Sequence, residues 1–167
     1  MADLVTHTCV AWLLKPSPRG RATFVLGTCV PDLLGRVPSM GLTTLRWSVH
    51  AIPEWTIYVW SPFHMPIGVL ASSALIAFFF PEDRRRTAFG WLVAGGLLHL
   101  AVDLLQRHFG VGYLLLFPFS WMDFEIGWIG SEDTVRIVPF LVPLTLLVAW
   151  YRRRRDARAG PGRPDRA

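Results

Sequence analysis

The chain has 167 residues, which is enough for one domain and leaves no room for a second core. Apolar residues make up 52% of it and the mean hydropathy is +0.37, above a typical soluble globular protein, with eight Trp and eleven Phe. The net charge of +5 lies wholly in residues 152–167, which hold seven Arg and two Asp, whereas residues 1–151 hold ten basic and ten acidic residues. A basic tail after an apolar segment indicates a cytoplasmic anchor rather than a nucleic-acid surface, so we expect no specific nucleic-acid partner.

Two short helices are predicted in the N-terminal part of the chain. They cover residues 3–14 and 22–34, and a basic segment rich in Pro and Gly at residues 15–21 joins them. Each would reach only about 18–20 Å, so we expect half-spanning or re-entrant elements. No basic region precedes the first apolar run, and we expect no cleaved signal peptide. Residues 35–60 have a mixed composition, and we expect them, with the aromatic segment 113–128, at the membrane interface.

Three apolar segments approach the length needed to cross a membrane. They cover residues 63–80, 88–105 and 135–151, and at about 17–18 residues each they lie at the lower limit for a hydrocarbon core of roughly 30 Å. Arginine clusters follow the first and third segments, which favours a membrane protein over a buried soluble bundle. We therefore predict an all-α fold, an integral membrane helical bundle of about five helices, two of them short. Residues 1–151 would form its one domain, and residues 152–167 a basic, disordered tail.

A histidine and an aspartate lie four residues apart within the second of these segments, at His99 and Asp103. Side chains at this spacing leave the same face of a helix. A charge buried among apolar residues costs several kcal/mol unless it is paired or binds a metal. We therefore interpret the two residues as metal ligands, although a hydrogen-bonded pair that only stabilises the bundle would give the same pattern.

Four further residues of ligand type lie in apolar context, at His7, Asp32, His50 and His64. Taken singly, Asp32 could be a turn residue, His7 a surface residue and His64 a helix cap, and His50 is the weakest candidate. Three histidines and two carboxylates suit Zn or another first-row divalent ion, and carboxylates can bridge two ions. The predicted ligands are His7, Asp32, His64, His99 and Asp103. The chain has no GxSxG, P-loop or GxGxxG motif, which argues against serine-hydrolase, nucleoside-triphosphate and dinucleotide chemistry.

Charge patterning predicts the orientation of the bundle. Basic residues at 15–21, 84–86 and 152–155 indicate the cytoplasmic side. When the chain is followed from those segments, all five predicted ligands fall in the opposite half of the bundle. We therefore expect a multi-pass protein of a bacterial-type inner (plasma) membrane, with its C-terminal tail in the cytoplasm and its metal site in the far half.

Five short motifs follow one another within roughly residues 5–125. They are Thr6-His7; Gly27-Thr28-Cys29-Val30-Pro31-Asp32; Phe63-His64-Met65-Pro66; His99-Leu100-Ala101-Val102-Asp103; and GVGYLLLFPF at residues 110–119. In their order and spacing they resemble the YdjM-like family of membrane-bound metal-dependent hydrolases, also described as LexA-binding inner-membrane proteins.

The resemblance implies a helical bundle distantly similar to zinc-dependent phospholipase C and single-strand nucleases. It also implies that His7, Asp32, His64, His99 and Asp103 are metal ligands. One position departs from the family pattern. Family members often carry two histidines four residues apart at the third motif, whereas this chain has Trp60 four residues before His64. Unless His50 takes that place, the chain lacks a ligand for a second metal.

Together these patterns predict a membrane-bound metal-dependent hydrolase that holds one or two divalent ions, Zn first among them. Its substrate would be a small or lipid phosphoester, attacked by a metal-activated water with Asp32 or Asp103 as the catalytic base. Membrane lipid is the other expected partner. Two other functions fit the same residues: a non-enzymatic membrane protein whose His/Asp cluster is structural, and a small cation or proton transporter. The transporter would call for inverted repeats, and the sequence shows none.

Overall fold

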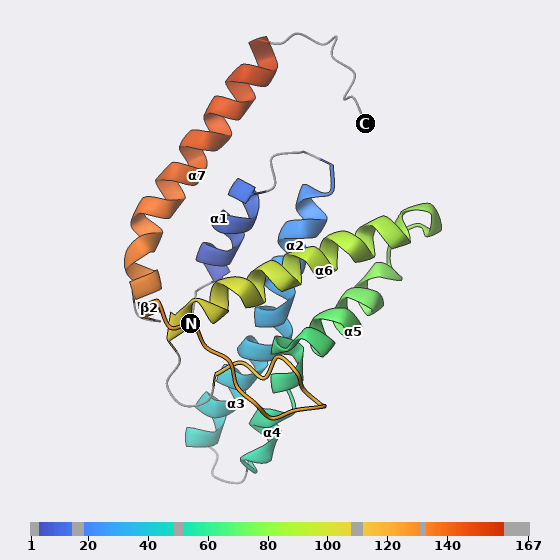
Figure 1. The fold of residues 1–167 in the computed structure, drawn as a ribbon, viewed down its shortest axis with the longest axis vertical. Coiled ribbons are helices and arrows are strands. Elements are labelled where there is room, and N and C mark those ends of the chain that lie inside the picture. The colour runs from blue at the N-terminus through green and yellow to red at the C-terminus, as the bar shows by residue number, and fades with distance from the viewer. Residues whose placement is uncertain (1–3, 15–18, 49–51, 108–111, 131–132, 159–167) are drawn as a thin grey trace.

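Helices account for most of this computed structural model, which describes residues 4–14, 19–48, 52–107, 112–130 and 133–158 (Figure 1). The predicted helical class is confirmed for this part of the chain. The first expected short helix is α1 (Leu4–Leu14), which packs against both α2 (Arg21–Pro31) and α7 (Asp133–Arg158). Figure 1 shows α6 (Glu82–Leu104) crossing α2, while α7 stands alongside α1.

Helices α2 and α6 cross at close range. A Cβ atom added at Gly27 would overlap the backbone of Leu92, and one added at Gly95 would overlap the carbonyl oxygen of Phe24. Only glycine fits at these two positions, because the backbones meet without room for a side chain. The crossing lays the end of α2 against the last turns of α6, where a hydrogen bond joins Thr28 to His99.

The helix that begins at Arg21 does not end near residue 34, as the sequence predicted. Directly after Pro31 it widens into a π turn, η1 (Asp32–Arg36), and then continues as α3 (Val37–Ser48). Pro31 has no N–H to donate into the helix. The Asp32 N–H donates to the Cys29 carbonyl, and the Val37 N–H donates to the Asp32 carbonyl five residues back. The expected short second helix is therefore one part of a longer helical path that takes in much of residues 35–60.

The prediction of a near-spanning helix at residues 63–80 is wrong. This segment begins in a 3-10 turn, η2 (Ser61–His64), and continues as α5 (Pro66–Ala77), which has only 12 residues. Proline disfavours the helical conformation in the residue before it, and Met65 is extended, with φ −125° and ψ 160°. Within the described residues, two helices rather than three have the length and hydropathy to span a membrane. These are α6, with 23 residues, and α7 from Val135 to Arg158.

Helix α7 also continues beyond the predicted end at residue 151. Residues 152–158 are helical, so the prediction of a disordered tail is wrong for them, and residues 159–167 lie outside the described residues. Arginine is a good helix former, and neither Gly nor Pro occurs between Pro143 and Gly160. The apolar window of α7 contains no buried residue. Apart from the side that contacts α1 and β2, this helix therefore presents an apolar surface that nothing else in the described chain covers.

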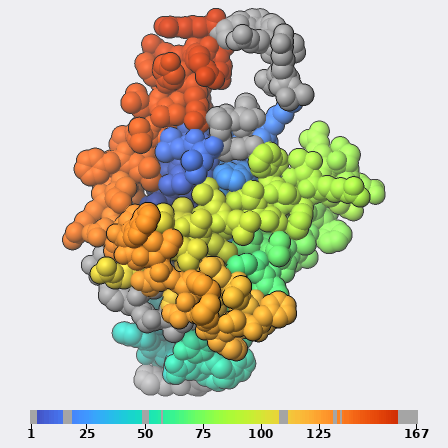
Figure 2. Space-filling view, viewed as in Figure 1, coloured from blue at the N-terminus to red at the C-terminus, as the bar shows by residue number. Residues whose placement is uncertain are grey.

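The segment after α6 forms the non-helical part of the structure. β1 (Gln106–Arg107) pairs in parallel with β2 (Ile129–Gly130), and Tyr113 forms an antiparallel bridge with Phe124. Figure 2 shows the atoms of this segment, in orange, on the surface between α6 and the short helix α4 (Trp55–Tyr58). Tyr113 joins Val69 and Leu100 in a small buried hydrophobic cluster, which fixes the segment against α5 and α6.

Candidate metal centre

His99 and Asp103 lie on one face of the last two turns of α6, as their spacing predicted. His99 is fully buried and Asp103 is 1% exposed. The Nε2 atom of His99 lies 3.3 Å from Oδ2 of Asp103. The other three predicted ligands lie around this pair.

His64 reaches the pair from the 3-10 turn that precedes α5. Its Nε2 atom lies 2.8 Å from Nε2 of His99 and 3.1 Å from Oδ2 of Asp103. Gly68 makes this turn possible, because a Cβ atom there would overlap the carbonyl oxygen of Pro62. The His64 side chain is 11% exposed, more than any other predicted ligand.

Asp32 enters the cluster from the π turn. Its Oδ1 atom lies 3.9 Å from Nε2 of both His64 and His99, and it accepts no hydrogen bond. In a regular α-helix the Asp32 N–H would bond to the carbonyl of Thr28, but here it bonds to Cys29. The Thr28 carbonyl oxygen instead accepts a hydrogen bond of 2.8 Å from Nδ1 of His99. Because a carbonyl only accepts, Nδ1 carries a proton, and Nε2 of a neutral His99 presents a lone pair to the cluster.

His7 comes from α1 and stacks on His99, with 3.9 Å between the ring centroids and 22° between the planes. Its Nε2 atom lies 3.1 Å from Oδ1 of Asp103. His7 is fully buried, yet neither of its ring nitrogens makes a hydrogen bond. Buried polar atoms normally have partners, so the orphaned atoms of His7 and Asp32 fit residues that bind an ion.

The predicted convergence of the five residues is confirmed: they come together from α1, η1, η2 and α6. His50 lies outside the described residues. Trp60 has no ligand atom to offer, and its ring lies near that of Phe63, with 6.1 Å between the centroids.

Two buried residues that the sequence interpretation missed hold Asp103 in place. The Tyr113 hydroxyl donates to Oδ2 of Asp103, and the Gln106 amide donates to Oδ1 over 2.9 Å. Gln106 follows Asp103 by three residues, a helical spacing that could have revealed it. Tyr113 lies in a segment that folds back onto α6, and no local sequence pattern predicts that path. Burial and the Asp103 carboxylate raise the pKa of the Tyr113 phenol well above its usual range, so it stays a hydrogen-bond donor.

The donor atoms could hold a metal ion in two ways. One group consists of His7, His99 and Asp103, the other of Asp32, His64 and His99, and in each the ligand atoms lie within 4.8 Å of one another. Imidazole nitrogens combined with carboxylate oxygens suit Zn and other first-row divalent ions. His99 belongs to both groups but has only Nε2 to offer, because Nδ1 is bonded to the Thr28 carbonyl. The two groups therefore compete for one ring nitrogen.

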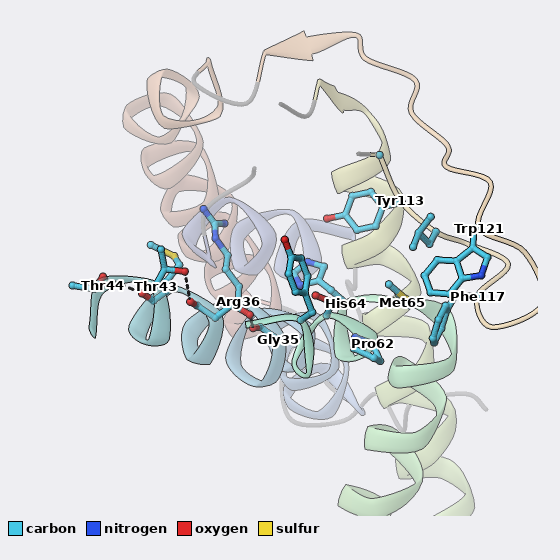
Figure 3. A pocket seen from close by; sticks show the side chains of 16 residues that line it. Gly35, Arg36, Thr43, Thr44, Pro62, His64, Met65, Tyr113, Phe117 and Trp121 are labelled. Carbon is cyan, nitrogen blue, oxygen red and sulfur yellow. Dashed lines mark hydrogen bonds between the residues drawn. The ribbon is translucent and has the colours of Figure 1, made fainter. Parts of the chain in front are cut away.

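A pocket of about 1200 Å³ adjoins the cluster (Figure 3). Its lining comes from η1, α3, the residues around η2 and the segment 112–121, and it includes both His64 and Tyr113. Each of these two residues also contacts Asp103. A molecule in the pocket can therefore reach the most exposed of the five ligands directly.

No family model, no curated protein and no solved structure matches this chain. The convergence of the His and Asp residues is consistent with the resemblance to a metal-dependent hydrolase family.

Proposed function

We propose that this protein is a membrane-bound hydrolase that uses a divalent metal ion, Zn first among the candidates, to cleave a phosphoester. The observation that carries the proposal is the junction between a buried cluster of three histidines and two aspartates and a pocket of about 1200 Å³. Structural metal sites are closed, whereas catalytic sites keep a position open to substrate. His64, which belongs to both the cluster and the pocket lining, provides that opening.

Charge balance supports a divalent ion. Asp32 and Asp103 are 4% and 1% exposed, and two carboxylates at this depth need positive charge close by. An ion of charge +2 would balance both while the three histidines stay neutral, the form in which imidazole binds metals. Because His99 offers a single nitrogen, we favour one ion over two.

The hydrogen bonds support different roles for the two aspartates. Tyr113 donates a hydrogen bond to Oδ2 of Asp103 and Gln106 donates one to Oδ1, and these two bonds orient Asp103 as a ligand. Oδ1 of Asp32 accepts none, so Asp32 can take a proton from a water molecule beside the cluster. A divalent ion held here would lower the pKa of such a water molecule and so supply the nucleophile near neutral pH.

Membrane attachment through α6 and α7 is part of the proposal. Both helices are long and apolar enough to span, and none of the apolar window of α7 is buried. The guanidinium groups of Arg21 and Arg152 each lie 5.0 Å from the ring centroid of Trp12, which is near the C-terminal end of α1 and five residues after His7. This gathering of basic residues away from the cluster supports an orientation with the basic end in the cytoplasm.

The metal content of detergent-purified protein tests the proposed site. Elemental mass spectrometry should find one equivalent of divalent metal in the wild type and far less in His99→Ala and Asp103→Asn. Asp83→Asn is the matched control, because Asp83 lies in the same helix with its side chain 74% exposed. Stoichiometric metal in both cluster variants would refute the site.

Turnover tests the reaction. Wild type loaded with Zn or Mn should hydrolyse a generic phosphodiester, Asp83→Asn should do the same, and the two cluster variants should not. If the protein binds metal but hydrolyses no phosphoester, the metal site is structural and the hydrolase proposal is wrong.

A further inference from the structure

The pocket beside the metal cluster has two walls of different chemistry. One wall comes from η1 and α3 and carries Arg36, in the same π turn as Asp32. Figure 3 shows Arg36, His64 and Tyr113 around the same cavity. A cation therefore lies close to the point where the pocket meets the cluster.

Arg36 is the charged residue of this wall. The neighbouring hydroxyls of Ser39 and Thr43 donate to backbone carbonyls four residues back, those of Gly35 and Ser39, at 2.7 and 2.8 Å. A guanidinium is the side chain best suited to the oxygens of a phosphoryl group, because it offers several N–H donors in a fixed plane.

The opposite wall is apolar and is formed by Met65, Leu114, Phe117 and Trp121. The rings of Phe117 and Trp121 meet edge to face, with 5.3 Å between their centroids. Trp121 lines the pocket and is nevertheless 74% exposed, and Phe119 between these two is 93% exposed. The apolar wall therefore continues onto the surface, as expected where a pocket opens toward lipid.

The pocket is also large. At about 1200 Å³ it exceeds the roughly 300–1000 Å³ of pockets that hold drug-sized ligands, so a phosphate group alone would leave most of it unfilled. We propose that the pocket binds a phosphoester with a long hydrocarbon chain, a lipid phosphoester. Arg36 engages its phosphoryl group, and Met65, Phe117 and Trp121 hold the chain. This inference rests on the proposed function and names its substrate class.

Binding of alkyl phosphates tests the proposal without reference to turnover. Metal-loaded protein in a maltoside detergent is titrated calorimetrically, and titrations into detergent alone are subtracted. Dodecyl phosphate should bind at least about 10-fold more tightly than butyl phosphate, because its longer chain buries more apolar area. Inorganic phosphate, which has no chain, and dodecanol, which has no phosphate, should both bind more weakly than dodecyl phosphate. Equal affinities for butyl and dodecyl phosphate, or for dodecanol and dodecyl phosphate, would overturn the proposal.

Five variants, two of them controls, test the roles of the two walls. Arg36→Gln should weaken the binding of dodecyl phosphate about 10-fold, the loss expected for a charged hydrogen bond, and Arg36→Lys should lose less. Arg46→Gln is the control, because Arg46 pairs with Glu54 over 3.3 Å outside the pocket. Trp121→Ala should weaken the binding of dodecyl phosphate but not of butyl phosphate. Its control is Trp128→Ala, at a tryptophan that is 80% exposed and outside the lining.

The outcomes separate this proposal from the hydrolase proposal. Hydrolysis of phosphodiesters combined with equal binding of short and long phosphates would overturn the lipid site and leave the hydrolase standing. Tight binding of dodecyl phosphate through Arg36 and Trp121 without any hydrolysis would support the lipid site and refute the hydrolase. Unchanged affinity in Arg36→Gln would overturn the role of Arg36.

Discussion

The Nε2 atoms of His64 and His99 lie 2.8 Å apart, while Nδ1 of His99 donates to the Thr28 carbonyl. A neutral His99 therefore directs a lone pair at His64. Either a proton on Nε2 of His64, donated to His99, or a metal cation bound by both Nε2 atoms would allow so short a distance. The two cases differ in how the protein responds to a chelator.

Removal of the metal should destabilise the protein, because it leaves two buried carboxylates without a balancing charge. At a free metal concentration about 100 times the Kd, binding contributes about 2.7 kcal/mol to the free energy of unfolding. The melting temperature of the wild type should fall on chelation and recover on addition of Zn. His64→Ala should respond to neither treatment. If the chelator left the melting temperature of the wild type unchanged, protons and not a metal ion would balance the two carboxylates.

Tyr113→Phe removes the hydroxyl that donates to Asp103 and keeps the ring in the hydrophobic cluster. Loss of a hydrogen bond that orients a ligand lowers metal affinity by about 10- to 100-fold. Competition with a chelating dye measures this change. Tyr151→Phe on α7, where the tyrosine is 62% exposed, should keep wild-type affinity. Equal affinity in the two variants would exclude a positioning role for Tyr113.

Gly95→Ala should destabilise the crossing of α2 and α6, because the new methyl group would overlap the Phe24 carbonyl. Overpacking of this kind costs about 1–3 kcal/mol. Gly90→Ala is the matched control in the same helix, since nothing lies within 4 Å of a Cβ atom there. It should instead stabilise α6 by about 0.5–1 kcal/mol through helix propensity. Denaturant unfolding followed by tryptophan fluorescence checks the opposite signs, and equal signs would contradict the close crossing.

Arg152 ties α7 to the end of α1. Its guanidinium donates to the Leu13 carbonyl over 3.0 Å and lies 5.0 Å from the ring centroid of Trp12. Arg152→Ala should lower the free energy of unfolding by about 1–2 kcal/mol, the combined value of these contacts. Arg153→Ala, at the exposed neighbouring position, should change it by less than about 0.5 kcal/mol. Equal losses would show that charge alone, and not the contact with α1, determines the effect.

Gly130→Cys reports the orientation of the protein in the membrane. If the basic end lies in the cytoplasm, this cysteine should react with an impermeant maleimide in intact cells. Arg158→Cys, at the other end of α7, should react only after the membrane is disrupted. Wild type gives the background from Cys9, which is buried, and Cys29, which is partly buried. The reverse pattern of labelling would overturn the orientation.

The five clustered residues could be predicted from the sequence because buried polar side chains stand out in apolar segments. His99 and Asp103 also had the spacing of one helix face. The path of the backbone was harder to predict. Pro31 and Pro66 are visible in the sequence, but one leads into a π turn within a continuous helix and the other ends a 3-10 turn. Hydrophobic periodicity does not distinguish these outcomes, because they depend on packing against α6 and α5.

Arg36 and Tyr113 could not be assigned from local patterns. Arg36 belongs to a segment of mixed composition, and its place beside the pocket depends on the course of the π turn. Tyr113 reaches Asp103 only because residues 112–130 fold back over α6 and bridge at Phe124. Both positions depend on tertiary contacts between segments that are distant along the chain, and no sequence pattern predicts such contacts.

The π turn at Asp32–Arg36 can also be regarded as an α-helix into which one residue has been inserted. An insertion of this kind rotates everything that follows by about 100° about the helix axis. Deletion of Leu33, which is 45% exposed, would restore an uninterrupted helix and turn α3 by that angle relative to α2. The polar wall of the pocket would then face away from the metal cluster. The number of residues in this one helical turn thus determines whether the polar wall, which recognises the substrate, faces the metal ligands.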